Sequence, residues 1–208
     1  MTNSSSSAPP AHLCLVRHAQ TDWNANGRWQ GHADPPLSAE GRGQAAALAL
    51  ALQSDLAGAD VGRLVCSDLG RTRETAGALG EMLGLEAILE PGLREIDIGD
   101  WSGLERSQIE KRDPDLLALF EGGDPDARPP GGETRREIRH RVRLVVRRIV
   151  DTAPEGGRIV VVTHLGVIRA LLPGAEPANA DFTWVSAADA LTRRMRVEHP
   201  EGESPGPL

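Results

Sequence analysis

The sequence predicts an α/β fold, a three-layer α/β/α sandwich with a mostly parallel central sheet. Short apolar runs alternate along the chain with segments of helical periodicity, and a helix candidate follows each main strand candidate. Alternating βα units of this kind pack as a parallel sheet with helices on both faces. The run RIVVVT at 158–163 is almost continuously β-branched, which is typical of a central strand buried on both faces.

The first elements follow from apolar runs and one helix cap. Residues His12–Arg17 form the first expected strand. Ser38 can accept a hydrogen bond from an exposed backbone N–H, so a helix is expected from there to about Ala51. The apolar run within Arg63–Ser67 predicts the second strand.

The next elements continue the alternation. Residues Leu69–Leu83 are expected to form a helix that ends at Gly84, because glycine readily takes the left-handed conformation that closes helices. A short strand is expected at Ala87–Leu89. Ser102 and Glu105 have the spacing of a capping box, in which each side chain binds a backbone N–H at a helix start.

The last third of the chain predicts two helices and three strands. Thr134 and Glu137 form a second capping-box pattern. The residues after them carry one apolar stripe, formed by Ile138, Val142, Val145, Val146 and Ile149. The central strand, Arg158–Thr163, and a further helix after Leu165 follow. Edge strands are expected at Phe182–Ala187 and Arg193–Glu198.

Length and composition indicate one globular domain. The 208 residues are divided into a disordered N-terminal segment at 1–11, a folded domain at 12–198 and a disordered tail at 199–208. The N-terminus MTNSSSSAPPA lacks the basic and apolar parts of a secretory signal, so a cytoplasmic location is expected. Cys14 and Cys66 lie within apolar runs and are expected to be buried free thiols.

The charge and hydropathy exclude two classes of partner. The formal net charge is −7 and the pI is near 5.4, which argues against nucleic acid as the main partner. No stretch reaches the roughly 18 apolar residues that a membrane-spanning helix needs, so no membrane partner is expected. An anionic substrate would therefore require positive charge concentrated locally at its site.

Basic side chains gather where the parallel strands end. Arg17 and His18 close the first strand, Arg71 follows the second, and His164 follows the central strand. Ligands of such folds bind beyond the carboxyl ends of the strands. Arginine binds phosphoryl oxygens with forked geometry, and a neutral imidazole can attack phosphorus to form a covalent intermediate. These residue types together predict phosphoryl chemistry.

A proton donor for the leaving group is expected nearby. The segment LREIDIG offers Glu95 as the first candidate and Asp97 as the second. A dianionic phosphate raises the pKa of a carboxyl group beside it, so the carboxyl could remain protonated until the leaving group needs its proton.

The motifs also support a family resemblance. The segment at 15–24, LVRHAQTDWN, followed by GRWQG at 27–31, closely resembles the opening signature of the histidine phosphatase superfamily, the phosphoglycerate mutase-like group. Later segments match in order, namely PPLS at 35–38, SDLGRT at 67–72, LRE at 93–95, GDWSG at 99–103, GGE at 131–133 and VTH at 162–164. The resemblance spans about residues 13 to 173 and implies the same sandwich fold.

The resemblance assigns roles residue by residue. It implies that His18 is the nucleophile, that Glu95 is the proton donor, and that Arg17, Arg71 and His164 hold the phosphoryl group. It further implies substrate or phosphate contacts for Asn24, Gln30, Gly31 and Leu165. The resemblance implies that the chemistry needs no metal, and the sequence agrees because it has no close-spaced set of metal ligands. No cofactor is expected for this chain.

Two positions depart from the family pattern. Ala19 stands where glycine commonly follows the nucleophile, and it should be tolerated unless its φ is positive. Leu165 stands between His164 and Gly166, where glycine is usual. Its backbone N–H can still point to phosphate at a helix N-terminus, while its bulk should narrow the pocket.

The expected function is a phosphatase for a small phosphorylated metabolite. Only 29 residues separate Gly103 from Glu133, shorter than the insertion that the resemblance implies for cofactor-dependent mutases. A phosphoglycerate mutase remains the first alternative, a non-catalytic phosphate-binding protein the second, and a metal-dependent hydrolase the third. The sequence does not identify the substrate, and a homodimer stays open.

Overall fold

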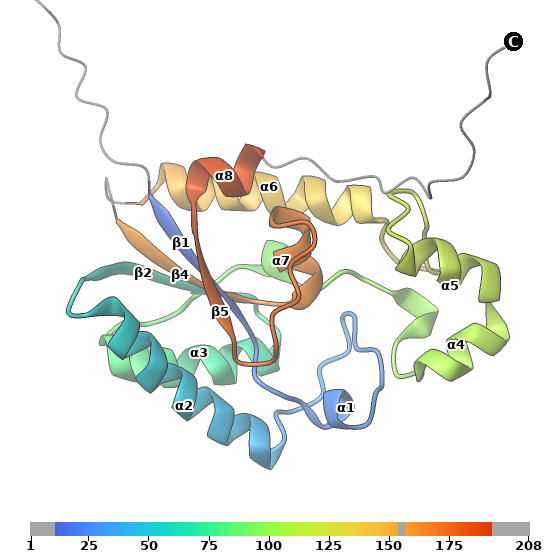
Figure 1. The fold of residues 1–208 in the computed structure, drawn as a ribbon, viewed down its shortest axis with the longest axis horizontal. Coiled ribbons are helices and arrows are strands. Elements are labelled where there is room, and N and C mark those ends of the chain that lie inside the picture. The colour runs from blue at the N-terminus through green and yellow to red at the C-terminus, as the bar shows by residue number, and fades with distance from the viewer. Residues whose placement is uncertain (1–10, 154–156, 193–208) are drawn as a thin grey trace, which may run out of the picture.

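Five strands form one sheet in the computed structural model, which describes residues 11–153 and 157–192 (Figure 1). The strands are β1 (His12–Arg17), β2 (Val61–Cys66), β3 (Ile88–Leu89), β4 (Arg158–Thr163) and β5 (Phe182–Ser186). Their order is β3-β2-β4-β1-β5. All neighbours pair in parallel except β5, which lies antiparallel to β1 at one edge. The mostly parallel sheet is therefore confirmed, as are the expected strand at 158–163 and the edge strand after residue 182.

The interior position of β4 explains its composition. It lies between β2 and β1, and every residue from Ile159 to Thr163 is fully buried. Cys14 faces Val160 and Val16 faces Val162 across the β1–β4 register. Both faces of β4 are covered from Ile159 onward, which explains why apolar β-branched residues fill Ile159–Val162, while only Arg158 at the start of the strand is partly exposed.

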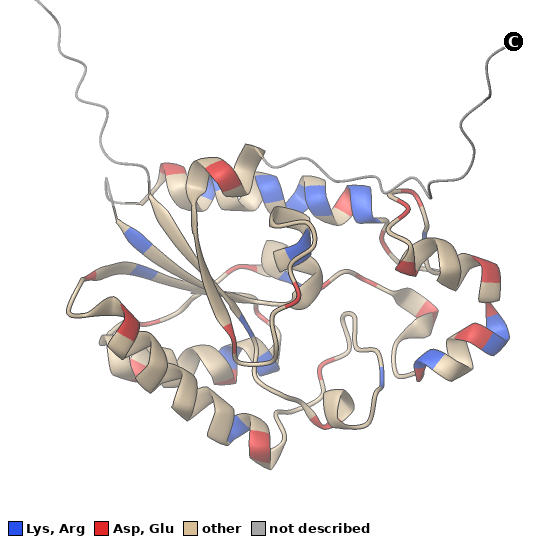
Figure 2. Ribbon diagram, in the orientation of Figure 1, with Lys and Arg blue, Asp and Glu red and all other residues tan. Residues whose placement is uncertain are grey.

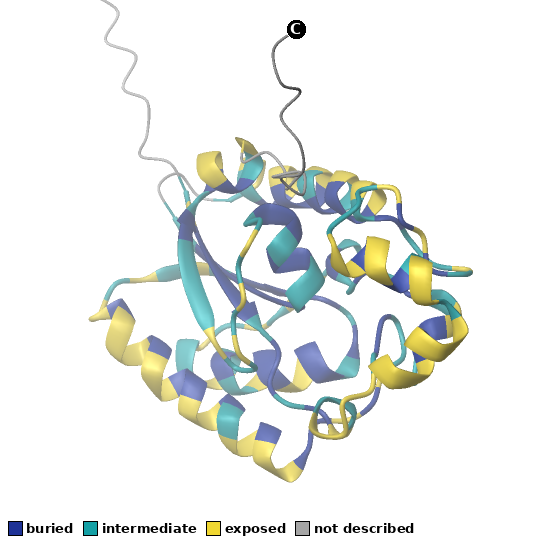
Figure 3. Cartoon of the chain, turned by 45° about the vertical axis from the view of Figure 1, so that its right-hand side comes forward, coloured by how far each residue is buried: buried dark blue, intermediate teal, exposed yellow. Residues whose placement is uncertain are grey.

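Helices cover both faces of the sheet. They are α1 (Asp22–Ala25), α2 (Ala39–Leu56), α3 (Gly70–Leu83), α4 (Arg106–Arg112), α5 (Pro114–Glu121), α6 (Arg135–Asp151), α7 (Leu165–Leu171) and α8 (Ala187–Thr192), with 3-10 turns at Pro91–Leu93 and Gly99–Trp101. The α2 and α3 helices pack on one face, and α6, α7 and α8 on the other (Figure 1). Figure 3 shows the exposed outer sides of α2 and α6 and the buried sides that they turn to the sheet. The predicted three-layer architecture is confirmed.

The expected helix caps are largely in place. Ser38 Oγ accepts from the Gly41 N–H at 2.9 Å and starts α2. This helix continues beyond Ala51 because Leu52 and Leu56 extend its buried stripe. Gly84 ends α3 with a φ of +66°, as predicted. The Thr134 capping box starts α6, whose predicted apolar stripe is buried.

One predicted cap is wrong. Ser102 closes the 3-10 turn at Gly99–Trp101, and α4 begins only after Glu105, which forms a capping box with Gln108. The chain between them forms a turn and not a helix, because Gly103 donates to the Trp29 carbonyl and has a φ of +82°. Backbone pairing with another loop therefore delays the helix.

The remaining differences concern short elements. Helices α1, α5 and α8 and the two 3-10 turns were not expected, and β2 begins two residues earlier than predicted. The predicted strand at Arg193–Glu198 and, except for Ala11, the terminal segments 1–11 and 199–208 lie outside the described residues. Within the described part, no helix is both long and apolar enough to span a bilayer.

Both cysteines are buried free thiols, as predicted. They pack on the α2–α3 face of the sheet. Burial raises the pKa of both thiols, that of Cys66 to about 11.

Candidate active site

The ends of β1, β2 and β4 converge on one cavity of about 1010 Å³. The His18 N–H donates to the Thr163 carbonyl at 2.9 Å, so the sheet pairing continues to the predicted nucleophile. Eight of the nine predicted site residues line this cavity, namely Arg17, His18, Asn24, Gln30, Gly31, Arg71, Glu95 and Leu165. The ninth, His164, is fully buried and its ring packs against that of His18 at the edge of the cavity lining.

His18 is held in one orientation and one protonation state. Its Nδ1 lies 2.8 Å from the Ala19 carbonyl oxygen, which can only accept, so Nδ1 carries the proton and Nε2 keeps its lone pair. Burial lowers the pKa of His18 well below 6.5, and the charges of Arg71 and Arg17 lower it further. The side chain is therefore a neutral imidazole at neutral pH, the form that can act as a nucleophile.

His164 packs against His18 edge to face. The ring centroids are 5.2 Å apart, with an interplanar angle of 60°. Burial first, then Arg71 and His18, lower the pKa of His164 well below 6.5. Neither ring nitrogen has a hydrogen-bond partner among the described residues. A buried polar atom without a partner is uncommon and is a mark of a ligand site.

Two arginines flank His18. Arg71 is fully buried, and its Nη1 and Nη2 donate to the carbonyls of Ala33 and Gly31 at 2.7 and 2.9 Å. Arg17 donates through Nη1 to the Pro177 carbonyl at 2.8 Å. The Nε atoms of both are buried and have no partner in the described part of the chain. Both side chains are thus fixed by backbone while keeping unused donors.

Asp34 links the second arginine to helix α3. Its Oδ1 lies 3.5 Å from Arg71 Nη1, and its Oδ2 accepts from the Gly70 N–H at 2.7 Å. Leu69 precedes α3 without a side-chain cap, so Asp34 supplies the missing acceptor from a distant loop.

Asn24 is oriented by a helix cap. Its Oδ1 accepts from the Thr21 N–H and Oγ at 3.1 and 3.0 Å. The Nδ2 atom, a donor, is thereby left for the cavity. Asn179, which the sequence reasoning did not select, donates to Asn24 Oδ1 at 3.4 Å and to the His18 carbonyl at 3.1 Å. No local motif marks Asn179, because its partners are about 160 positions away.

Glu95 reaches the cavity from the loop after β3. Its Oε2 accepts from the Gly166 N–H at 3.3 Å, near the start of α7, and its Oε1 accepts from the Ile96 N–H at 2.9 Å. Asp97, the reserve candidate, does not line the cavity. Asp97 instead accepts from the Gly99 N–H and lies 3.6 Å from His32. The geometry therefore favours Glu95 as the acid.

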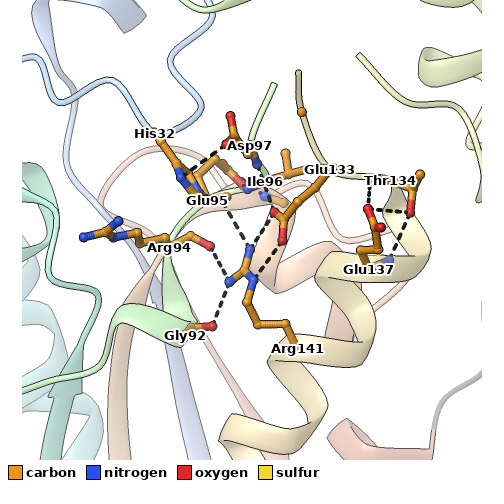
Figure 4. A network of polar contacts seen from close by, with 12 residues as sticks. His32, Gly92, Arg94, Glu95, Ile96, Asp97, Glu133, Thr134, Glu137 and Arg141 are labelled. Carbon is orange, nitrogen blue, oxygen red and sulfur yellow. Dashed lines mark hydrogen bonds and ion pairs between the residues drawn. The ribbon is translucent and has the colours of Figure 1, made fainter. Parts of the chain in front are cut away.

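A polar network that the sequence reasoning missed holds the Glu95 loop (Figure 4). Arg141 of α6 donates to the carbonyls of Gly92, Arg94 and Glu95 at 2.8, 3.1 and 3.4 Å. It also makes a two-bond ion pair with Glu133, at 3.0 and 2.8 Å. His32 Nε2 lies 2.8 Å from the Glu95 carbonyl oxygen on the other side. The backbone at Glu95 is thus bound from two directions.

The loop after α1 contributes two constrained residues, Gln30 and Gly31, to the cavity. Gln30 is buried, and its Oε1 has no partner among the described residues, so it can accept from a ligand hydroxyl. Gly31 has a φ of +50°, and a Cβ there would lie 2.5 Å from Ile98 Cγ1. Only glycine fits this turn without strain.

The two departures from the family pattern are accommodated. Ala19 is fully buried and does not have a positive φ, so its methyl group causes no backbone strain. Its N–H donates to Thr75 Oγ1 at 3.0 Å. Leu165 begins α7 and lines the cavity, where its side chain takes up space.

The cavity also carries residues outside the predicted set. The lining as a whole contains six arginines, Arg17, Arg28, Arg71, Arg135, Arg139 and Arg169, against three glutamates, Glu95, Glu121 and Glu176. This positive excess contrasts with the net charge of −7 of the chain. The expected local concentration of positive charge is present. Apolar lining is supplied by Trp29, Phe120 and Ile138, among others.

No group of three or more His, Cys, Asp or Glu side chains within residues 11–153 and 157–192 is arranged to hold a metal ion.

Comparison with known proteins finds related sequences and structures. The model of the histidine phosphatase superfamily (branch 1) matches residues 13–204. Glucosyl-3-phosphoglycerate phosphatase of Mycobacterium tuberculosis is 38% identical over 89% of this chain and 92% of that protein. Phosphoglycerate mutase-like protein 4 of Arabidopsis thaliana is 37% identical over 81% of this chain and 72% of that protein. A mycobacterial glucosyl-3-phosphoglycerate phosphatase solved with VO3 superimposes with a TM-score of 0.76 at 35% identity, covering 84% of this chain and 92% of that one.

Proposed function

Since this chain belongs to branch 1 of the histidine phosphatase superfamily, we propose that it hydrolyses small-molecule phosphate monoesters through a phosphohistidine on His18. One observation carries the proposal. Nδ1 of His18 is bound to the Ala19 carbonyl, so the lone pair of Nε2 is available at a cavity lined by Arg17, Arg71 and Glu95.

The first step transfers the phosphoryl group to the enzyme. Nε2 of His18 attacks phosphorus while the bond to the ester oxygen breaks. Arg17, Arg71 and His164 bind the phosphoryl oxygens, and Glu95 gives its proton to the departing alkoxide. Phosphohistidine and a free alcohol result.

The second step returns the enzyme to its starting state. Glu95, now a carboxylate, removes a proton from a water molecule that attacks the phosphohistidine. Inorganic phosphate leaves, His18 regains its neutral form, and Glu95 is protonated again. The same group therefore serves first as acid and then as base.

The relatives suggest which phosphate ester to try first. The mycobacterial relative is named for glucosyl-3-phosphoglycerate. The cavity of about 1010 Å³ is large enough for a sugar-bearing ester. A glycosylated phosphoglycerate is therefore the first substrate candidate, ahead of simple sugar phosphates.

The test is phosphate release from a panel of monoesters in the presence of EDTA. The panel contains glucosyl-3-phosphoglycerate, 3-phosphoglycerate and several sugar phosphates. We expect release by the wild type and none by His18→Ala, while His140→Ala, a change at an exposed histidine of α6, serves as the control. Acid-labile, alkali-stable labelling of the protein by radioactive substrate reports the phosphohistidine.

Phosphate release that EDTA abolishes would favour a metal-dependent hydrolase instead. No turnover of any ester would leave a phosphate-binding protein.

A mutase is the second candidate, because one relative is named phosphoglycerate mutase-like protein 4. A mutase keeps the phosphoryl group on the enzyme until it returns to the sugar acid. Formation of 2-phosphoglycerate from 3-phosphoglycerate with little release of phosphate would therefore support this alternative.

A further inference from the structure

One tight turn, which runs from Gln30 to Ala33, holds Arg71 in place. The Ala33 N–H donates to the Gln30 carbonyl at 2.9 Å and closes the turn. The carbonyls of Gly31 and Ala33 accept from Nη2 and Nη1 of Arg71 at 2.9 and 2.7 Å. His32 is the residue between these two carbonyls. Any group that its ring binds is therefore fixed in position relative to Arg71.

The ring of His32 contacts the segment that carries the proposed acid (Figure 4). Its Nε2 lies 2.8 Å from the Glu95 carbonyl oxygen. Because a carbonyl oxygen can only accept, Nε2 carries a proton and donates it to this oxygen. Its Nδ1 lies 3.6 Å from Oδ2 of Asp97, two residues further along the chain. One ring thus contacts the segment on both sides of Ile96.

The backbone of the turn also packs directly against this segment. A Cβ on Gly31 would lie 2.5 Å from Cγ1 of Ile98 and 3.1 Å from its backbone nitrogen, so only glycine permits this approach. Figure 2 shows basic residues along α6, and one residue of that helix, Arg141, donates to the Glu95 carbonyl at 3.4 Å. The bond from His32 is the shorter of the two bonds to this carbonyl.

We propose that His32 is a positioning residue that fixes Glu95 relative to Arg71. Arg71 binds the phosphoryl oxygens, while the carboxyl group of Glu95 must reach the ester oxygen that departs. Proton transfer requires that this oxygen lie within hydrogen-bond reach of the acid, and a misplacement of about 1 Å can lower a rate on the order of 10²-fold. His32 is not among the residues that line the cavity, so it acts through Glu95 and not on the substrate. This inference rests on the proposed function, because Glu95 is the acid of that mechanism.

Leaving groups of different basicity distinguish a misplaced acid from a general loss of structure. An alkoxide is a strong base and needs a proton as it departs, whereas 4-nitrophenolate is a weak base and departs without one. The test therefore compares 4-nitrophenyl phosphate with the alkyl ester of the panel that has the highest kcat/KM. The measured quantity is the ratio of the alkyl kcat/KM to the 4-nitrophenyl kcat/KM. This ratio reports the transfer of the phosphoryl group to His18 and excludes the later hydrolysis of phosphohistidine.

Three variants at histidines test the ratio. His32→Leu removes the donor, and we expect it to lower the ratio by roughly 10- to 100-fold, part of what a positioned acid contributes. His32→Gln places an amide N–H near the position of Nε2 and should restore most of the ratio. His140→Leu changes an exposed histidine of α6 and is the matched control, which should keep the wild-type ratio. Thermal unfolding of the full chain establishes that each variant is folded.

A double-mutant cycle with Glu95→Gln identifies the residue through which His32 acts. Glu95→Gln lacks the acid, so by itself it should lower kcat/KM for the alkyl ester. Adding His32→Leu to it should lower that kcat/KM no further, because there is no longer an acid to position. Additive losses in the cycle, or no rescue by His32→Gln, would overturn the positioning role.

The same measurements separate this inference from the proposed function. If phosphate release depends on His18 but His32→Leu slows both esters equally, only the positioning role of His32 is wrong. If the wild type hydrolyses no ester, or if His18→Ala releases phosphate as fast as the wild type, the proposed function is wrong, and the role of His32 in it is wrong as well.

Discussion

The carboxylate of Glu95 occupies space that a side chain at position 166 would fill. The Gly166 N–H donates to Glu95 Oε2 at 3.3 Å, and a Cβ atom on Gly166 would lie 2.2 Å from Glu95 Oε1. The glycine that follows Leu165 thus positions the proposed acid, both by donating a hydrogen bond and by lacking a side chain.

Gly166→Ala should therefore impair catalysis more than folding. The added methyl group must displace the Glu95 carboxylate, because the clash is too close to absorb by small shifts. We expect kcat to fall by roughly 10- to 100-fold, part of what a general acid contributes. Steady-state kinetics and thermal unfolding measure the two effects. Gly77→Ala on α3, where a Cβ meets nothing within 4 Å, should leave kcat unchanged, and an equally active Gly166→Ala would contradict this role of the glycine.

Asn179→Ala should misalign the nucleophile. The His18 carbonyl accepts from two donors, the Asn179 side-chain amide and the Ala180 N–H. The substitution removes the first of these donors, and it also removes a hydrogen-bond partner of Asn24. We expect kcat to fall by about 10-fold and the unfolding free energy to fall by roughly 1 kcal/mol, the usual net worth of one hydrogen bond. Asn26→Ala removes only an exposed bond to the Asp22 carbonyl and is the control. Similar kinetics in the two variants would argue against a positioning role for Asn179.

Arg141→Lys should loosen the loop that carries Glu95. Lysine keeps the charge but cannot bind three carbonyls and the Glu133 carboxylate together. We expect a loss of roughly 1–3 kcal/mol in unfolding free energy and a lower kcat. Denaturant unfolding and kinetics provide the measurements, with Arg147→Lys at an exposed position of the same helix as control.

The coupling between Arg141 and Glu133 can be measured separately. A double-mutant cycle of Arg141→Lys with Glu133→Gln should be non-additive, because both changes weaken the same two-bond ion pair. Simple additivity in this cycle would show that the two side chains act independently.

The buried histidines should make stability depend on pH. Burial lowers the pKa of His18 and His164 well below 6.5 in the folded state. In the unfolded chain they bind protons near pH 6.5, so the unfolded state gains protons first as the pH falls. The contribution of these two histidines to the unfolding free energy is therefore fully present above about pH 6.5 and declines below it, by ~1.4 kcal/mol per pH unit for each histidine.

Denaturant unfolding of the wild type and His164→Gln between pH 7.5 and 5 tests this, since the variant should show the shallower decline. If the unfolding free energies of the wild type and the variant declined equally steeply with pH, His164 would bind protons equally in the folded and unfolded states, contrary to this prediction.

Local patterns determined much of the framework and of the candidate active site. The β-branched run of β4, the Ser38 and Thr134 caps and the glycine after α3 were read correctly, because each depends on residues within a few positions. The placement of basic side chains at strand ends also followed from sequence. Parallel strands bring their carboxyl ends to one edge, so His18, Arg71 and His164 had to meet there.

Tertiary structure decided the features whose partners are far apart in the chain. Helix α4 starts at Arg106 rather than just after Ser102 because Gly103 and Leu104 pair with the backbone of Trp29. Asn179 meets His18, and Arg135 and Arg169 come to line one cavity, only after α6, α7 and the loop before β5 have packed. Periodicity shows which face of a helix is apolar, but not which distant groups meet its polar side chains. For that reason the sequence predicted phosphoryl chemistry, while the contacts that hold Glu95 and the further arginines of the cavity lining emerged only from the packed fold.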